Sequence, residues 1–341
     1  MHVVDAGAFE VRPLSLDESP DAVATLQAAF REWPSDMEGG NPLEHFRWKH
    51  LECPLGQSLM FVAEADARVV GFAAWLPCTF AAGGKTIEAR RSVDLAVRPE
   101  YRGRGVAAAL ATAGGEHAPA GTAFTFSNPN SLSMSGVLRL GRRRVGVLPK
   151  LVRFLSPLRA VRSRRADFAR VLAAISIDAP RVSVALADEQ RVSALLSEVR
   201  VQEHRLSPIK DVAYLRWRYG VQGEYHARLL ETGGRLAGLA IFRLRRHRAS
   251  WNIRVCELFV AGDDRWHARR LLKDVLGAAD VDYATCVFAT DTVQRSAARR
   301  CGFVGLRRGE TLVVYPLRSD IDPDPTDLHS WALTLGDLEL L

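Results

Sequence analysis

The chain has 341 residues, of which 48% are hydrophobic, and its formal net charge is +7. This length is comfortable for two domains, and the hydrophobic fraction is ordinary for a globular protein. No run of 18 apolar residues is present, and the N-terminus lacks the basic start and apolar stretch of a signal peptide. The five scattered cysteines include no Cys-x-x-Cys pair, which predicts reduced thiols in a cytoplasmic protein and no metal site.

The predicted elements of the N-terminal half alternate between helix and strand. A serine and a proline begin a helical pattern over residues 19–33. Residues 58–80 read as two strands around an Asp-Ala-Arg turn, and residues 90–97 as a further strand. A helix of small residues over 105–118 and a strand over 122–128 follow, which together predict an α+β unit.

The C-terminal half repeats the order of the first half. Four correspondences occur in the same sequence order: "FRWKH" (46–50) with "LRWRY" (215–219), "RVVGFAAWLP" with "RLAGLAIFRL", Asp94 with Glu257, and the eleven-residue spacings Asn130 to Gly141 and Asp291 to Gly302. We therefore expect two copies of one unit. The predicted boundaries are an N-terminal domain at 1–155, a basic linker at 156–175, a C-terminal domain at 176–318 and an acidic tail at 319–341.

The stretch "PEYRGRGVAAAL" (99–110) predicts a phosphate-binding turn between a strand and a helix. Glycines tolerate positive φ, so consecutive backbone N–H groups can converge on one anion at the helix N-terminus. No Gly-Lys-Ser/Thr follows, which excludes a P-loop, and no acidic residue lies between Glu116 and Asp167, which argues against a dinucleotide. Coenzyme A is the remaining ligand.

The segment "VDLAVRPEYRGRGVAAAL" resembles the GNAT superfamily of acyl-CoA N-acyltransferases. Residues 102–107 carry the [Arg/Gln]-Gly-x-Gly core of its signature, and Val97, Pro99 and Tyr101 match the lead-in. "FRWKHLECPLG", "FSNPNS" and "LHSWALTLGD" look like tandem GNAT proteins that are often linked to surface-polysaccharide pathways.

This resemblance implies a fold of two tandem GNAT-like domains, each a mixed, mostly antiparallel sheet flanked by helices. It implies acetyl-CoA as acyl donor and a small-molecule amine, such as an amino sugar or a related metabolite, as acceptor. The amine would attack the thioester directly, while the strand backbone pairs with pantetheine and the turn holds the pyrophosphate. The implied cofactor-binding residues are Leu95, Ala96, Val97, Arg102, Gly103, Arg104, Gly105, Val106, Ala107 and Asn130.

Asp94 is the predicted catalytic base, and the alternative is a structural carboxylate paired with Arg90 or Arg91. Many family members place a tyrosine that protonates the thiolate seven residues after the asparagine, where this chain has Val137. Ser135 is our candidate for the missing acid, with a neighbouring serine or water as alternatives.

Two features leave other functions open. The second copy has "RWHARR" (265–270) in place of the glycine turn, so we expect it not to bind coenzyme A in the same way. Residues 139–170 carry a net charge of +10, from 11 basic and one acidic side chain. A solvated linker explains this charge, as do a phosphorylated substrate, tRNA or an anionic membrane surface. The alternative functions are therefore an aminoacyl-tRNA-dependent transferase and a catalytically silent acyl-CoA-binding protein.

Overall fold

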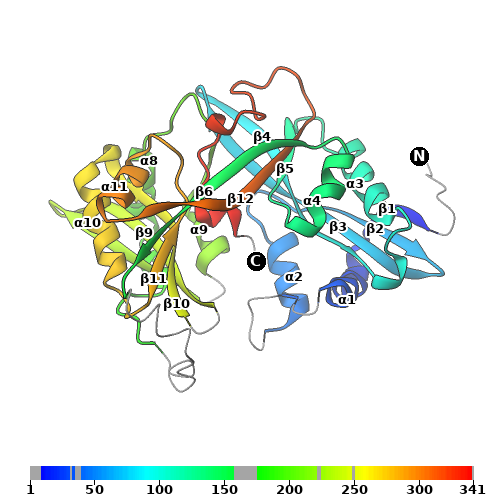
Figure 1. Ribbon diagram of the computed structural model, residues 1–341, viewed down its shortest axis with the longest axis horizontal. Helices are drawn as coiled ribbons and strands as arrows, with labels where there is room; N and C mark the ends of the chain where they lie inside the picture. The colour runs from blue at the N-terminus through cyan, green and yellow to red at the C-terminus, as the bar shows by residue number, and fades with distance from the viewer. Residues whose placement is uncertain are drawn as a thin grey trace. The chain divides into compact units, whose positions relative to one another are not determined.

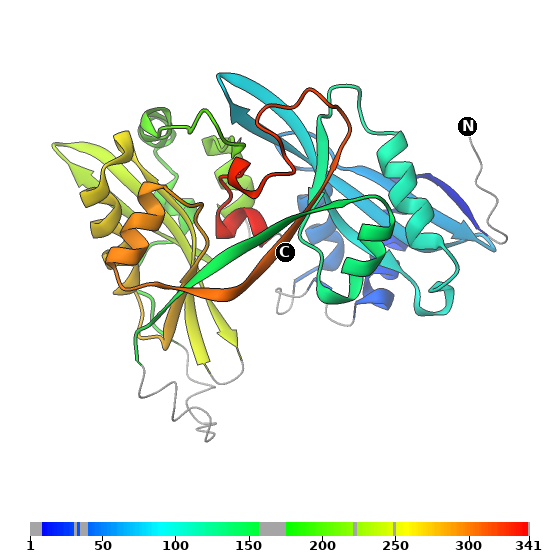
Figure 2. The same ribbon diagram turned by 45° about the horizontal axis from the view of Figure 1, so that its top comes forward.

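The computed structural model describes residues 9–30, 33–34, 40–156, 175–220, 224–247 and 250–339. The chain divides into two compact units (Figures 1 and 2). The first unit contains residues 1–146 and 311–327, and the second contains residues 147–310 and 328–340. Within the described ranges, no helix combines the length and the apolar character that crossing a bilayer requires.

The first unit is built on a mostly antiparallel sheet. Its strand order is β1-β2-β3-β4-β5-β12, and only β4 and β5 run parallel. The strands are β1 (Glu10–Pro13), β2 (Leu59–Ala65), β3 (Arg68–Ala82), β4 (Lys85–Val97), β5 (Phe124–Ser127) and the end of β12 (Val304–Pro316). The helices are α1 (Ser19–Ala29), α2 (Pro42–His50), α3 (Val106–Glu116) and α4 (Ser131–Arg139).

Helices cover both faces of this sheet. Successive residues of a strand point to opposite faces, and in β2 and β3 both sets are mostly apolar. Phe61, Ala63 and Trp75 pack with α3, whereas Val62 and Phe72 pack with α1 and α2. The near-continuous apolar sequence of β3 follows from burial on both faces. The sheet therefore forms the middle of three layers.

The second unit repeats this arrangement. Its strand order is β12-β6-β11-β10-β9-β8, and here β10 and β11 are the parallel pair. The strands are β6 (Arg143–Phe154), β8 (Tyr225–Thr232), β9 (Arg235–His247), β10 (Ser250–Val260) and β11 (Tyr283–Cys286), with a short β7 at Ser207–Pro208. The helices are α7 (Val182–Ala185), α8 (Glu189–Glu198), α9 (Val212–Leu215), α10 (Arg265–Leu276), α11 (Val293–Arg300) and α12 (Leu335–Leu338).

The sequence repeat also appears in the strand registers. Gly71 lies opposite Val97 at the end of β4, and Gly238 lies opposite Val260 at the end of β10. A Cβ on Gly71 would stand 2.7 Å from Val106 Cγ1 of α3, and one on Gly238 would stand 3.0 Å from Leu271 Cδ2 of α10. In each unit, the glycine at this position therefore leaves room for the helix that packs on the sheet. This confirms the predicted fold class of two units with mostly antiparallel sheets flanked by helices.

Strands β6 and β12 change units along their length, which differs from the predicted domain boundaries. Residues 313–316 of β12 pair with β5 in the first unit, while residues 151–154 of β6 pair with β11 in the second. Residues 147–154 thus belong to the second unit and residues 311–318 to the first. The predicted linker, 156–175, lies outside the described residues except at its two ends.

Candidate functional site

The glycine turn joins β4 to α3 in the first unit. Gly103 and Gly105 have φ values of 78° and 86°, a left-handed conformation that favours glycine. Gly105 is the N-cap of α3, and no side chain caps this helix end. The first backbone N–H groups of α3 therefore have no side-chain acceptor and are available to bind an anion such as a phosphate.

The two arginines of the turn have different surroundings. Arg102 donates from Nε to the Val97 carbonyl oxygen at 3.2 Å and from Nη2 to that of Ala29 at 3.1 Å. The Arg104 guanidinium lies 5.1 Å from the centre of the Tyr101 ring. Arg102 therefore braces the turn against β4 and α1, whereas Arg104 supplies a positive charge beside it.

The end of β4 has one open edge beside the turn. Residues 89–91 pair with β5, but in the described part of the chain residues 92–97 pair only with β3. An irregularity falls here, because Val93 pairs with Ala74 and Ala96 with Phe72, leaving Asp94 and Leu95 opposite Ala73 alone. Leu95, Ala96 and Val97, the predicted pantetheine strand, lie along this open edge.

Asp94 sits at the irregularity, with a φ of 49°, and its carboxylate is held by residues of α2. Lys49 Nζ lies 2.6 Å from Oδ2, and His50 Nε2 lies 3.1 Å from the same oxygen. Burial alone would raise the pKa of Asp94, but the charge of Lys49 and the bond to His50 outweigh it and lower that pKa. The alternative pairing with Arg90 or Arg91 is wrong, since Arg90 donates to the Trp75 carbonyl and Arg91 to Asn128.

His50 links this cluster to Ser58. Its Nδ1 lies 3.0 Å from Ser58 Oγ, and the imidazole is fully buried. Burial lowers the pKa of His50, so the neutral ring is favoured at neutral pH. The sequence analysis identified the "FRWKH" motif only as a repeat and did not predict that it contacts Asp94. The available signal was that both copies of the motif end in a basic residue followed by a residue that can form a hydrogen bond.

The remaining predicted residues lie on and before α4. Asn130 Oδ1 accepts a hydrogen bond from Ser133 N at 2.9 Å, so this side chain caps α4. Ser135 is exposed, and Val137, which replaces the usual tyrosine, is buried. The structure thus places Asp94 and residues 95–107 on one strand and turn, and Ser135 on a separate helix.

The second unit closes both features that the first leaves open. The carboxylate of Asp264, the N-cap of α10, accepts from Trp266 N at 2.8 Å and from His267 N at 2.9 Å. On β10, Gln294 Nε2 donates to the Leu258 carbonyl oxygen at 3.2 Å. An internal carboxylate and an internal amide therefore occupy the positions that would face a pyrophosphate and a pantetheine amide.

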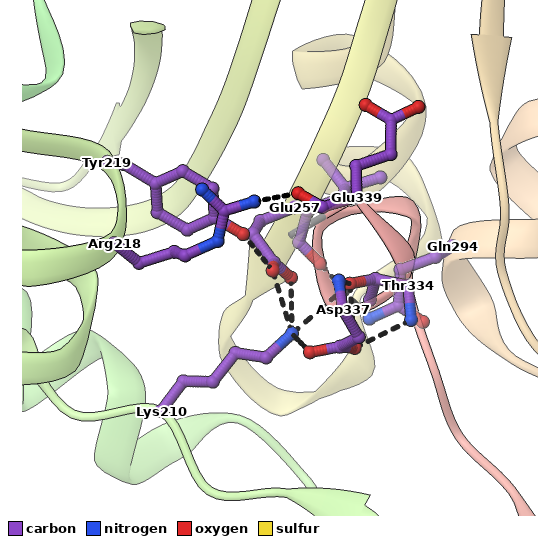
Figure 3. Close-up of polar contacts among 9 residues, drawn as sticks. Lys210, Arg218, Tyr219, Glu257, Gln294, Thr334, Asp337 and Glu339 are labelled. Carbon is purple, nitrogen blue, oxygen red and sulfur yellow. Dashed lines mark hydrogen bonds and ion pairs between the residues drawn. The ribbon is translucent and has the colours of Figure 1, made fainter. Parts of the chain in front are cut away.

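Glu257, the counterpart of Asp94, lies in a buried polar cluster (Figure 3). Lys210 Nζ bridges Glu257 Oε1 at 2.7 Å and Asp337 Oδ1 at 2.8 Å, and the Tyr219 hydroxyl donates to Glu257 Oε1 at 2.6 Å. Burial raises the pKa of Glu257, and the Asp337 charge adds to this against the opposing effect of Lys210. The last residue of each repeat motif, His50 or Tyr219, thus contacts the strand carboxylate of its own unit.

Comparisons with known proteins bear on the family resemblance and the fold. Residues 10–135 match a family model described as an acetyltransferase (GNAT) domain. Among solved structures, the chain is similar to a GCN5-related N-acetyltransferase from Anabaena variabilis, with a TM-score of 0.64, 15% identity and coverage of 91% of this chain and 73% of that one. A search of curated proteins found no match.

Two further solved structures share the fold. One is a conserved protein of unknown function from Enterococcus faecalis, described as a probable N-acyltransferase, with a TM-score of 0.63, 14% identity and coverage of 92% and 73%. The other is a GCN5-related N-acetyltransferase from Kribbella flavida, with a TM-score of 0.57, 14% identity and coverage of 91% and 72%. The predicted GNAT resemblance is confirmed, and the family match supports acyl transfer as the class of reaction.

Proposed function

We propose that the first unit transfers an acetyl group from acetyl-CoA to the amine of a small molecule. The observation that carries this proposal is the contrast between the two units. Only the first, within the described residues, combines a positive-φ glycine at an uncapped helix with a strand edge whose backbone at 94–96 makes no side-chain hydrogen bond. Residues 102–107 would hold the pyrophosphate, and residues 95–97 would pair with the pantetheine arm.

The reaction proceeds by direct attack in a ternary complex. The amine nitrogen forms a bond to the thioester carbonyl carbon, the carbon–sulfur bond breaks, and the amine proton ends on solvent or on the departing thiolate. A backbone N–H at the open edge of β4 would stabilise the oxyanion. The acceptor, by the sequence resemblance to polysaccharide-associated tandem GNAT proteins alone, is an amino sugar or a related metabolite.

Asp94 fits a positioning role better than the predicted role of base. A general base is most effective when its pKa lies near the working pH, whereas Lys49 and His50 lower the pKa of Asp94. Its contacts fix α2 to the end of β4, beside the strand edge that would bind the donor. For the thiolate acid, Ser135 stays a prediction, and water is sufficient because a thiolate is a good leaving group.

The test is calorimetric titration of acetyl-CoA into the wild type and into two matched variants. Gly105→Val puts a β-branched residue at φ 86°, and Gly262→Val makes the same change at φ 61° before α10 of the second unit. In both places an added Cβ would meet no atom within 4 Å, so each variant carries backbone strain without a steric clash.

We expect one site per chain, lost in Gly105→Val and retained in Gly262→Val. A survey of amino sugars, monitored by release of the coenzyme A thiol, then identifies the acceptor. Absence of acetyl-CoA binding to the wild type at low salt would overturn the proposal and direct the search to aminoacyl-tRNA. Binding without turnover of any amine would leave an acyl-CoA-binding protein.

A further inference from the structure

The first arginine of the basic run "RRR" (142–144) turns into the protein. Arg142 is 9% exposed, whereas Arg143 and Arg144 are exposed. Its Nη1 donates to Thr125 Oγ1 at 2.9 Å, and no carboxylate of the described residues forms an ion pair with it. Burial lowers the pKa of Arg142, the direction expected for a cation without a counter-ion. A buried guanidinium retains several N–H donors that one threonine cannot satisfy.

A cavity of about 270 Å³ opens beside this guanidinium, within the first unit. Thr125 and Arg142 contribute to its wall with Leu140, Leu317 and the exposed Glu116. The cavity uses residues 111–116 of α3, toward the C-terminal end of that helix, whereas the glycine turn lies at its N-terminal end. It is therefore separate from the proposed acetyl-CoA site.

The charges of the cavity favour an anion with a single negative charge. Arg142 is the only basic residue among its lining residues, and Glu116 is the only acidic one. The guanidinium fork matches the two oxygens of a carboxylate, while the Glu116 carboxylate disfavours a phosphate dianion. Leu140 and Leu317 offer apolar surface to a short carbon chain.

We propose that this cavity binds a small monocarboxylate, with its oxygens on Arg142 and its carbon chain against Leu140 and Leu317. Such a ligand supplies the counter-ion that the described protein residues do not. The site would take a metabolite that is distinct from the acyl donor and from the amine. Part of the basic segment would then serve a small anion rather than a nucleic acid or a membrane surface.

The test measures binding of butyrate to the full chain by calorimetry and thermal shift at constant ionic strength. Butyramide, which has the same shape without the charge, and inorganic phosphate are the comparison probes. We expect saturable binding of butyrate, no binding of butyramide, and weaker binding of phosphate. Butyramide binding as well as butyrate, or phosphate binding more tightly, would overturn the proposal.

Two charge variants locate the site. Arg142→Gln should abolish butyrate binding, while Arg144→Gln, which removes an equal charge from an exposed neighbour, should retain it. Glu116→Gln changes an exposed residue and should tighten butyrate binding about two- to fivefold, because it removes a repulsive charge at the cavity. If Arg142→Gln does not fold, the Glu116→Gln variant still tests the proposal. An unchanged affinity for butyrate would show that butyrate does not bind in this cavity. Saturating acetyl-CoA should not displace butyrate.

Discussion

The ion pair between Lys49 and Asp94 provides a test of whether Asp94 acts by position or as a base. Asp94→Asn removes the charge but keeps the shape of the side chain. Lys49 is 3% exposed, and its Nζ lies 2.6 Å from the carboxylate that it would lose. Removing one partner of a buried ion pair typically costs about 3–5 kcal/mol, because the lost attraction no longer offsets the desolvation of the other charge. We therefore expect a loss of that size in the free energy of unfolding.

The double variant Lys49→Met with Asp94→Asn should recover much of this loss, because neither charge of this pair then remains buried. Urea unfolding followed by tryptophan fluorescence measures all four members of the cycle. In parallel, the pH dependence of turnover separates the two roles, since a positioning residue lowers the rate without removing a titration from the profile. The reasoning is refuted if Asp94→Asn changes stability by less than about 1 kcal/mol, the value typical of exposed pairs.

Three further predictions concern packing, capping and pH. Gly114→Ala would put a Cβ 2.2 Å from the Trp75 ring in the first unit and should destabilise it by about 1–3 kcal/mol, measured by urea unfolding against Gly115→Ala, where the space is open. Asp264→Ala should cost about 1 kcal/mol as a lost N-cap, without creating a second acetyl-CoA site by calorimetry, because Gln294 still occupies the β10 edge. Burial lowers the pKa of His50, so the stability that its neutral ring contributes is complete above about pH 6.5 and is lost as the pH falls below it. The free energy of unfolding should therefore depend less on pH between pH 7 and pH 5 in His50→Gln than in the wild type. His204→Gln, a change at an exposed histidine, is the control and should keep the wild-type pH dependence.

The sequence predicted the glycine turn and the order of elements because both depend on local patterns. Positive φ at Gly103 and Gly105 and a helix beginning at Val106 follow from the residues themselves. The partners of Asp94 could not be read in the same way, since Lys49 lies 45 positions earlier and two basic residues, Arg90 and Arg91, lie close by on the same strand. Proximity in sequence favoured the wrong partners, and the packing of α2 selected the right one.

The exchange of strands between the units shows a second limit of local patterns. β6 and β12 follow the same point of the repeat, after α4 and after α11, so each is a plausible edge partner for either β5 or β11. Hydrophobic periodicity fixes which residues form a strand but carries no information on which of two equivalent partners it pairs with. In the structure β12 pairs with β5 and β6 pairs with β11.

The two copies differ at two places, the start of the helix after the central strand and the open edge of that strand. In the first unit, Gly105 contributes no side chain to the start of α3, and the edge of β4 beyond Arg91 has no β5 partner. In the second unit, Asp264 and Gln294 satisfy the corresponding backbone groups from within the chain. Unpaired backbone donors and acceptors are costly when buried, so these internal hydrogen bonds stabilise the second unit. The second copy keeps its carboxylate, Glu257, and pairs it with Lys210 in a buried polar cluster (Figure 3).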